Sequence, residues 1–454
     1  MKRIITLLFL GIFAFSTAQL PAATPAHGFG LLDAEELQFT YQKLISEFYK
    51  KVDAQAVLDG AHDNLIAYLQ HEGVADPKVP SLHAVDDSSQ NVRELDREVS
   101  NAVTAYHSAR FTPRDLTYAT IAGMLGSVKD RYTVFLTPKE FAALNEGLDG
   151  TTFSGTGIVI QSDETTKFIT VSNVVPDGPA DKAGIQQDDV LYTVDGKTTK
   201  GLTIDQASSL LRGKQGTTVT LQVQRDGALL ANPISIVRAP IHQLSVYSKM
   251  LPNKIGYVAL TVFGRDTGAE LTTALDRLQT QGARAFVLDL RENGGGYLQA
   301  AVQVSSKFIP SGPIVSVESR QSQIDTIEAD NDAIPPAPLV VLVNGHTASA
   351  SEITSGAIQD SGVGTIMGTK TFGKGVVQNV WALPDGSAVK ITTARYLTPR
   401  NRDINTVGIQ PDVVTPENPK PRYGTLGRDD QLQKAVQFLQ NKIAQLSSPA
   451  PGSQ

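Results

Sequence analysis

The sequence contains no cysteine. It therefore has no disulfide framework, no thiolate nucleophile and no thiol to which a lipid could be attached. A chain of 454 residues is long enough to bury a full-sized apolar core without covalent cross-links. Apolar packing must stabilise the fold, and any covalent catalysis must use a nucleophile other than a thiol.

Histidine is also sparse, and its seven copies are scattered without an H-x-x-x-H pair or an acidic cluster at metal-binding spacing. Zinc sites need such ligands at short, regular intervals. We therefore expect neither a metal nor another cofactor. The formal net charge of −6 argues against a nucleic-acid partner, because proteins of that kind carry a basic stripe.

Long apolar runs are missing beyond the N-terminus. The chain begins with Met-Lys-Arg, continues through apolar residues 4–15 and reaches small residues at Ser16-Thr17-Ala18. This order is typical of a secretory signal peptide, which we predict over residues 1–18. The mature protein would be periplasmic or secreted, and an uncleaved leader would anchor it in the membrane.

The next region is expected to be helical. Over residues 33–150, apolar side chains recur at intervals of three and four, as in Leu37, Tyr41, Leu44 and Phe48. That spacing places them on one face of a helix. The sequence therefore predicts a helical N-terminal region.

The rest of the chain changes pattern twice. Residues 151–238 contain short apolar strands punctuated by glycine, which predicts one small β-rich domain. Residues 239–426 alternate strands with helices, which indicates an α/β core with a mostly parallel sheet covered by helices. A C-terminal helix is expected over 427–446 and a disordered tail over 447–454. The predicted fold class is multidomain α+β.

A serine follows one of the apolar strands of the third region. Residues 338–343 form that strand, and the next segment ends in Thr-Ala-Ser-Ala-Ser-Glu. Ser349 could act as a nucleophile there, but with Glu352 it also fits the helix-capping pattern S-x-x-E. Ser351 is a second candidate nucleophile. The segment alone leaves these roles open.

A lysine lies among the glycines of segment 368–375. The spacing approaches that of a phosphate-binding loop, which needs Ser or Thr after the lysine and then a helix. Gly375 and a strand-like run follow instead. Lys374 is therefore a candidate base for a serine. In an extended segment Gln378, four residues later, would project from the same side and orient the amine.

Such a base must be uncharged near neutral pH. A solvated lysine has a pKa of about 10.4, whereas an efficient general base needs a pKa of about 7 to 8. Burial disfavours the charged amine and lowers its pKa. Phe372, Val376 and Val377 are the candidates for an apolar lining around Lys374.

A glycine-rich turn ends another predicted strand, where residues 289–296 read Asp-Leu-Arg-Glu-Asn-Gly-Gly-Gly. Glycine permits a tight strand-to-helix turn. The unobstructed N–H groups of such a turn can also face a developing oxyanion. The pattern is compatible with both roles.

Together these segments resemble the carboxyl-terminal processing peptidases, also called tail-specific proteases. The resemblance rests on an ordered set of motifs at 289–296, 347–353, 368–378, 396–399 and 408–412. It implies a serine endopeptidase that uses a serine and a lysine.

Residue by residue, the resemblance assigns a catalytic role to three side chains. It implies that Ser349 is the nucleophile, Lys374 the base and Gln378 the residue that supports the base. The oxyanion donors would be the amide of Ala350 and an amide of the glycine turn, for which Gly295 is favoured.

Residues 154–238 resemble the PDZ domain of these enzymes. A PDZ domain binds a free C-terminus as an added strand and holds its carboxylate with backbone N–H groups. This implies a carboxylate cradle at Gly155, Thr156, Gly157 and Ile158. An ordinary glycine turn is the alternative.

The expected function is a secreted or periplasmic endopeptidase that recognises the C-terminal tails of protein substrates. The alternative is a non-catalytic periplasmic PDZ scaffold. The family also implies a homo-oligomer or a helical-repeat adaptor as a further partner. The chain departs from the family at 127–132, which only loosely matches an Asp-Pro-Tyr stretch, and at Arg400-Asn401, where Ser-Gly is common.

Overall fold

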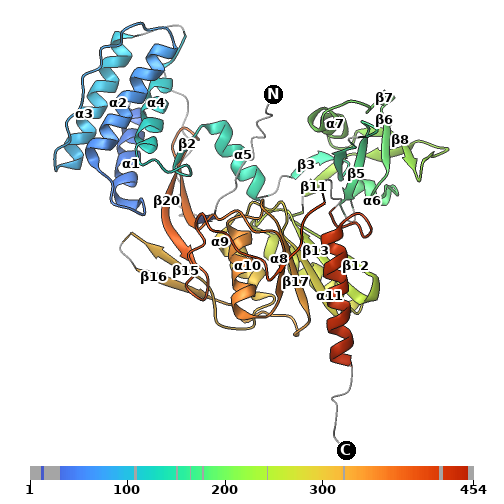
Figure 1. Cartoon of the computed structure of the whole chain (residues 1–454). Coiled ribbons are helices and arrows are strands. Elements are labelled where there is room, and N and C mark those ends of the chain that lie inside the picture. Colours follow the sequence, from blue (N-terminus) through green and yellow to red (C-terminus); the bar gives the residue numbers. More distant parts are fainter. Residues whose placement is uncertain are drawn as a thin grey trace, which may run out of the picture. The chain divides into compact units, whose positions relative to one another are not determined.

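The chain forms two compact units (Figure 1). One consists of residues 1–148 and 246–454, and the other of residues 149–245. Among the described residues, no helix combines the length and apolarity that crossing a membrane requires. The computed structural model describes residues 12–14, 31–106, 110–149, 152–163, 165–175, 178–242, 244–320, 323–418 and 423–447.

Two of the predictions therefore fall largely outside the described residues. Of the predicted leader at 1–18, only the strand β1 (Ile12–Ala14) is described. Of the predicted tail at 447–454, only the first residue is described, as the end of a helix.

The larger unit begins with a group of helices. They are α1 (Leu31–Glu47), α2 (Ala54–His71), α3 (Ser88–Ala105), α4 (Pro113–Gly126) and, after the strand β2 (Val134–Leu136), α5 (Pro138–Asp149). Asp53, Asp87 and Thr112 each cap a helix by accepting a backbone N–H. Helices α2 and α4 pack closely where Gly60 faces Gly123. Glycine is needed there, since a Cβ on Gly123 would lie 2.2 Å from the carbonyl oxygen of Gly60. A helical N-terminal region is thus present.

These helices share a core with strands from the end of the chain. Tyr41 and Leu44 of α1 are buried in the same cluster as Trp381 and Ile391. The latter two belong to β19 (Val376–Ala382) and β20 (Ala388–Leu397). The helical region is therefore continuous with the α/β part.

The α/β part is built on a six-stranded sheet with the order β12-β13-β14-β17-β18-β21. The neighbours from β13 to β21 pair in parallel, and β12 pairs antiparallel at the edge. The expected mostly parallel sheet is confirmed here. The strands are β12 (Val246–Leu251), β13 (Ile255–Leu260), β14 (Ala285–Asp289), β17 (Leu339–Val343), β18 (Thr365–Gly368) and β21 (Val413–Val414).

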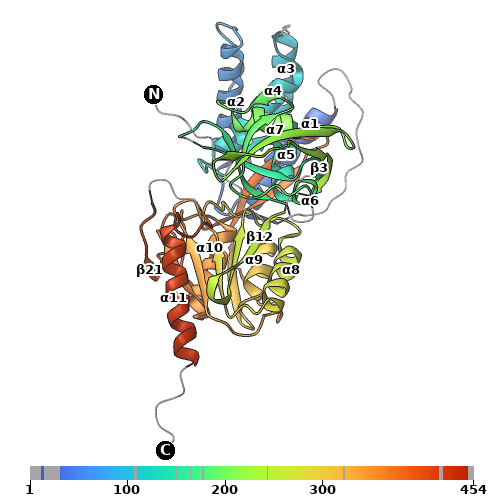
Figure 2. The ribbon, with the colours of Figure 1, turned by 90° about the vertical axis from the view of Figure 1, so that its right-hand side faces the viewer.

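Side chains of the sheet alternate between two cores, one on each face. In β14, Phe286 and Leu288 join the cluster that contains the buried faces of α8 (Thr267–Thr280), α9 (Leu298–Ser306) and α10 (Ala350–Ser361). Val287 joins a separate cluster under α11 (Asp430–Ser447). Figure 2 shows α8 and α11 on opposite sides of the strands. The predicted C-terminal helix thus packs on the sheet as part of the core.

A second sheet completes the larger unit. Strands β16 (Ile324–Glu328), β15 (Pro313–Ser319), β20 and β19 pair antiparallel, with β2 on β20. β1 pairs in parallel with β19. The sequence predicted this part only as β-rich. The mostly parallel arrangement therefore describes one of the two sheets.

The smaller unit has its own core. Its main sheet has the order β10-β8-β6-β5-β4, with β7 on β6 and β9 on β8, and a separate pair joins β3 to β11. The unit spans residues 149–245, and the domain predicted from the sequence at 151–238 lies within it. Its elements are β3 (Thr152–Gly155), β4 (Ile158–Ser162), β5 (Ile169–Val174), α6 (Pro179–Lys182), β6 (Val190–Val194), β7 (Lys197–Thr198), α7 (Ile204–Leu211), β8 (Thr218–Arg225), β9 (Ala228–Leu229), β10 (Ile234–Val237) and β11 (Ala239–His242).

Candidate active site

Ser349 lies in a strained turn between β17 and α10. Its backbone has φ 62° and ψ −119°, a conformation that L-residues other than glycine rarely adopt. Such strain costs on the order of 1–3 kcal/mol and is concentrated at functional sites. The side chain is 0% exposed, and its hydroxyl has no hydrogen-bond partner among the described residues. The hydroxyl is therefore not engaged in capping the helix.

Lys374 lies in the loop between β18 and β19 and is also fully buried. Its amine has no hydrogen-bond partner within the described part of the chain, and it lies 4.5 Å from the ring centre of Tyr132. Burial lowers the pKa of Lys374 well below its ordinary value, and the positive charge of Lys390 lowers it further. The neutral amine that a general base requires is thus favoured.

The carboxylate of Glu352 joins the two segments. One of its oxygens, Oε2, accepts the amide N–H of Ser349 at 2.9 Å and that of Lys374 at 2.8 Å. The other oxygen, Oε1, accepts the amide of Gly373 at 2.7 Å and the hydroxyl of Thr371. Burial raises the pKa of Glu352, and these four hydrogen bonds oppose that shift. A single carboxylate therefore brings the backbones of both predicted catalytic residues together.

Tyr396 of β20 makes a second connection between the same residues. Its hydroxyl is buried and lies 3.2 Å from the carbonyl oxygen of Ser349 and 2.5 Å from that of Lys374. The sequence pattern singled out Glu352 only as half of a capping box. It gave Tyr396 no role of its own, although the residue lies in one of the motifs.

Gln378 is fully buried on β19. Its Nε2 donates to the hydroxyl of Thr392 at 3.2 Å, while its Oε1 has no partner in the described residues. The extended geometry expected from 374 to 378 is interrupted, because β19 begins at Val376 and the register shifts between Val377 and Gln378. Simple alternation along a strand therefore does not fix the direction of this side chain.

The glycine turn packs directly against the serine. A Cβ on Gly295 would lie 2.8 Å from Ala350 N and 2.8 Å from Ser349 Cβ, so a side chain does not fit there. The amide of Gly295 donates to Asn293 Oδ1 at 2.9 Å in this conformation and is therefore occupied. Ala350 is the first residue of α10, so its N–H has no acceptor within the helix.

The turn itself is held by a buried ion cluster. The guanidinium of Arg291 binds the carboxylates of Asp289, at the end of β14, and Asp429, just before α11. Asp289 also accepts the hydroxyl of Tyr257 at 2.8 Å. Asp289 and Arg291 therefore fasten the turn to the segment that begins the C-terminal helix.

Ser351, the second candidate nucleophile, and the histidine that could replace Lys374 as a base have other contacts. The hydroxyl of Ser351 donates to the carbonyl oxygen of Asn293 at 2.9 Å. His346, the nearest histidine to the serine in sequence, lies 2.9 Å from Glu292, and its side chain is 49% exposed. Ser351 is buried like Ser349, but its hydroxyl is engaged with a carbonyl, and His346 is not buried.

The predicted carboxylate cradle lies where β3 passes into β4. Gly157 has φ 78°, which favours glycine, and its carbonyl accepts the amide of Val175 at 2.8 Å. The carbonyl of Thr156 accepts the amide of Ala180 at 2.9 Å, which anchors the loop to α6. Ile158 opens the edge strand β4. The carbonyl groups of the loop thus bond inside the unit.

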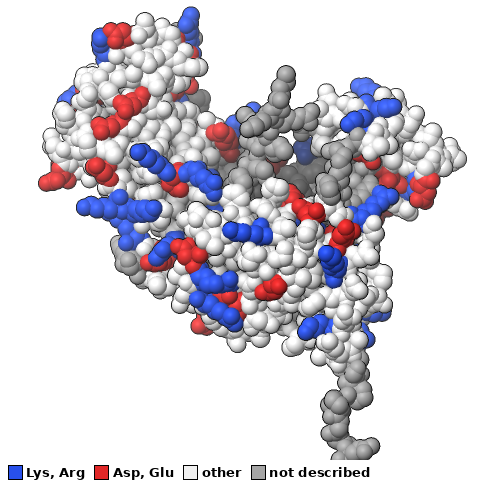
Figure 3. Space-filling view, in the orientation of Figure 1, with Lys and Arg blue, Asp and Glu red and all other residues white. Residues whose placement is uncertain are grey.

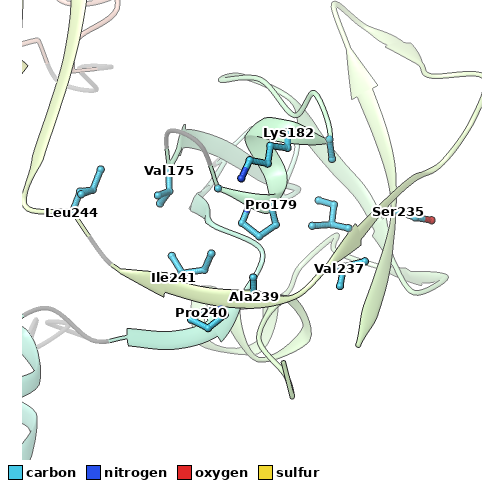
Figure 4. A pocket seen from close by; sticks show the side chains of 12 residues that line it. Val175, Pro179, Lys182, Ser235, Val237, Ala239, Pro240, Ile241 and Leu244 are labelled. Atoms are coloured by element: carbon cyan, nitrogen blue, oxygen red, sulfur yellow. The ribbon is translucent and has the colours of Figure 1, made fainter. Parts of the chain in front are cut away.

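An open cavity of about 760 Å³ also lies on the smaller unit (Figure 4). Val175, Pro179, Lys182 and Ile241 are among the residues that line it, and the four cradle residues are not. A Cβ on Gly157 would nevertheless lie 3.4 Å from the side chain of Ile241, so the loop adjoins the wall of the cavity.

The charges on the molecular surface are mixed. On the face shown in Figure 3, basic and acidic side chains are interspersed, and no basic stripe is visible on that face. Among the described residues, no group of three or more His, Cys, Asp or Glu side chains could hold a metal ion.

Comparisons with known proteins agree on one family. Residues 254–415 match peptidase family S41, and residues 170–225 match a PDZ domain. The carboxyl-terminal-processing protease of Picosynechococcus sp. is 37% identical over 341 residues, which cover 74% of this chain and 82% of that protein. The protease of the same name from Synechocystis sp. is 34% identical over 337 residues, covering 73% and 78%.

A solved structure assigned to the S41 proteases, from Bacteroides fragilis, has the same fold. It superimposes with a TM-score of 0.53 at 16% identity and covers 93% of this chain and 100% of that one. The chain therefore belongs to the carboxyl-terminal processing proteases of peptidase family S41, as a serine-type protease with a PDZ domain and protein substrates.

Proposed function

We propose that Ser349 and Lys374 form the catalytic dyad of this protease. The observation that carries the proposal is the position of Glu352, whose Oε2 accepts the amide protons of both residues. The serine hydroxyl and the lysine amine are both buried, and neither has a hydrogen-bond partner among the described residues. They are available to each other during turnover.

In the proposed reaction, the neutral amine of Lys374 accepts the hydroxyl proton as Ser349 Oγ attacks the scissile carbonyl carbon. The resulting ammonium then protonates the departing amine, and the peptide C–N bond breaks to leave an acyl-enzyme. Water attacks the ester in the second half, with Lys374 again taking and returning a proton. Atoms and charges balance without a metal or cofactor.

The developing oxyanion lies beside the start of α10 in this proposal. The amide of Ala350 is proposed as one donor to the oxyanion, because this N–H has no acceptor within the helix. Gly295 can contribute a second donor once its amide leaves Asn293 Oδ1. Because Gly295 packs against Ser349, such a movement of the amide would take place beside the nucleophile.

The PDZ domain is proposed to recognise substrates by their free C-terminal tails. A tail would add as a strand beside β4, with its carboxylate at the amides of residues 155–158. Two observations support this site: β4 is an edge strand, and the loop bonds inward through its carbonyls. An extended tail needs both a free edge and backbone donors.

The surroundings in which the protein acts are also part of the proposal. The leader-like residues 1–18 support export, which would make the protein periplasmic or secreted, or membrane-anchored if the leader is retained. A homo-oligomer or a helical-repeat adaptor remains a proposal drawn from the family resemblance alone. A purely non-catalytic scaffold is disfavoured, because a scaffold has no need of a buried, neutral lysine.

The decisive experiment is replacement of the nucleophile. We expect Ser349→Ala to reduce cleavage of an unfolded substrate with an apolar C-terminus by about 10⁴-fold or more. An acylating serine probe should add its mass to the parent enzyme and not to this variant. Ser351→Ala is the matched control and should keep activity within about tenfold of the parent, since that hydroxyl only bonds a carbonyl. Full turnover by Ser349→Ala would refute the dyad.

A further inference from the structure

A chain of hydrogen bonds leads from Gln378 to a loop that the catalytic assignment leaves without a role. Gln378 Nε2 donates to Thr392 Oγ1 at 3.2 Å, and the Thr392 hydroxyl donates to Asp130 Oδ2. The hydroxyl of Thr133 donates to the same carboxylate oxygen at 2.7 Å. The amide of Thr392 in turn donates to Thr133 Oγ1 at 3.1 Å.

The direction of each bond in this chain is fixed by chemistry. An ionised carboxylate can only accept, so the single hydroxyl proton of Thr392 is committed to Asp130. Thr392 Oγ1 is then left as an acceptor, and it selects the NH₂ end of the Gln378 amide. The amide oxygen of Gln378 must point the other way. That oxygen is buried and has no partner in the described part of the chain, as is also true of the Lys374 amine.

The orientation of this amide matters for a lysine base. A neutral amine has two N–H bonds and one lone pair, and the lone pair must remain free to take the serine proton. An amide oxygen accepts an N–H from the amine and leaves the lone pair available. An amide NH₂ facing the amine would instead donate to the lone pair and compete with Ser349.

We propose that Asp130 and Thr392 are positioning residues that orient the Gln378 amide so that its oxygen, and not its nitrogen, is presented to Lys374. The inference rests on the proposed dyad. Neither residue bonds the reacting atoms: Thr392 acts through Gln378, and Asp130 acts through Thr392 as well as through its charge near Lys374.

The position of the loop supports this role. Residues 127–133 lie between α4 and β2, far in sequence from the dyad, yet Tyr132 of the same loop contacts the Lys374 amine. Thr392 and Gln378 are neighbours across the β19–β20 pair. The charged groups that act on Lys374 are Lys390, Asp130, Arg131 and Glu352. Two of these four belong to the loop, so the loop surrounds the amine as well as orienting its partner.

The first test compares two substitutions of one side chain. Thr392→Val removes the hydroxyl at nearly constant volume, and we expect kcat to fall about 10- to 100-fold with KM within about twofold, the size of effect that misplacing a catalytic group produces. Thr392→Ser retains the hydroxyl and should restore kcat to within about threefold. Thr120→Val is the matched control, because Thr120 is an equally buried threonine that bonds only a carbonyl of its own helix.

The second test is a double-mutant cycle, which separates positioning from a general loss of structure. If Thr392 acts through Gln378, then Thr392→Val should have no further effect on kcat in a Gln378→Ala background. Asp130→Ala frees the Thr392 hydroxyl to turn and also removes a charge near Lys374, so its effect should shrink in the Gln378→Ala background without vanishing. Thermal unfolding of every variant is measured alongside.

Each outcome decides the proposal. Full kcat in Thr392→Val, or an equal loss in the parent and in the Gln378→Ala background, would overturn the positioning role. Failure of the dyad is recognised separately. In that case Ser349→Ala would remain active, or the probe that labels the parent enzyme would still label this variant.

Discussion

The α/β core and the PDZ unit assemble their functional groups in different ways. In the core, the proposed catalytic side chains of Ser349, Lys374 and Gln378 are fully buried. Glu352 and Tyr396 bond the backbones of Ser349 and Lys374, and Thr392 bonds the side chain of Gln378. In the PDZ unit, the proposed cradle is one continuous segment, 155–158, whose backbone would do the binding.

The difference follows from the chemistry each site needs. A lysine base must be desolvated, and burying an amine requires many neighbours that only tertiary packing can supply. A carboxylate can be bound by successive backbone amides, which a local glycine turn provides. We therefore expect the core site to respond strongly to single side-chain changes and the PDZ site to respond weakly.

After replacement of the nucleophile, the largest effect is expected at the base. Lys374→Met keeps the length of an apolar stem and removes the amine, so cleavage should fall by about 10²- to 10⁴-fold. The unfolded chain carries a protonated lysine at neutral pH, whereas burial favours the neutral form after folding. The folding stability contributed by this residue is therefore lower at low pH and recovers as pH rises towards the ordinary lysine pKa.

Removing the buried amine should accordingly make the protein more stable, by about 1–2 kcal/mol, the usual size of a stabilising substitution. Substrate turnover and chemical denaturation at pH 7 measure the two effects. Lys434→Met, on the helix α11, is the control. An active Lys374→Met enzyme would point to another base.

The next effect is expected at the residue that joins the dyad. In Glu352→Gln, an amide NH₂ must replace one of the two oxygens that now accept four donors. The two donors that bonded the replaced oxygen then face the amide NH₂, which is itself a donor. Each hydrogen bond to a charged group that is lost in this way costs about 1.5–3 kcal/mol. We expect kcat to drop about 10- to 100-fold and the melting temperature to fall. Unchanged kinetics would show that the carboxylate is dispensable for aligning Ser349 and Lys374.

The pH dependence distinguishes the two sites. Because only the neutral amine of Lys374 accepts a proton, kcat/KM should fall about tenfold per pH unit below its lowered pKa and reach a plateau above it. Peptide affinity for the PDZ unit, measured with Ser349→Ala, should stay constant over the same range because a C-terminal carboxylate remains ionised. A rate that keeps rising to about pH 10.4, the ordinary lysine value, would contradict the desolvated base.

The smallest effect is expected from the substrate tail. Amidating the C-terminus of a peptide substrate removes the charge that the cradle would bind, and kcat/KM should drop by about three- to tenfold, the size of a hydrogen-bonding loss at an exposed site. The control is a pair of peptides with the same free C-terminus, in which one internal carboxylate side chain is replaced by its amide. Equal rates for acid and amide would remove the proposed tail recognition and leave the dyad untouched.

Much of the fold and of the site could be predicted from short-range patterns. The three-and-four spacing of Leu37, Tyr41 and Leu44 indicated helices, and all three are buried in the helical core. The segments around 349 and 374 are candidates because one places a serine after an apolar strand and the other a lysine among glycines.

Other features escaped the sequence because their cause is not local. Asp130 and Thr392 are separated by 262 positions, and a side chain's partner across such a distance leaves no periodic trace. The register shift at Gln378 and the antiparallel second sheet depend in the same way on which strands meet. The occupied amide of Gly295 depends on the rotamer of Asn293.

The sequence by itself determined which groups the protein can use: an absence of thiols and of metal-ligand clusters, a serine before a helix, and a lysine among glycines. Only the tertiary structure decided their state. It strained the backbone of Ser349, enclosed the amine of Lys374 and gave the two residues a shared carboxylate. The physical reason is that desolvation and hydrogen-bond direction are properties of surroundings, and these surroundings are assembled from segments that are distant along the chain.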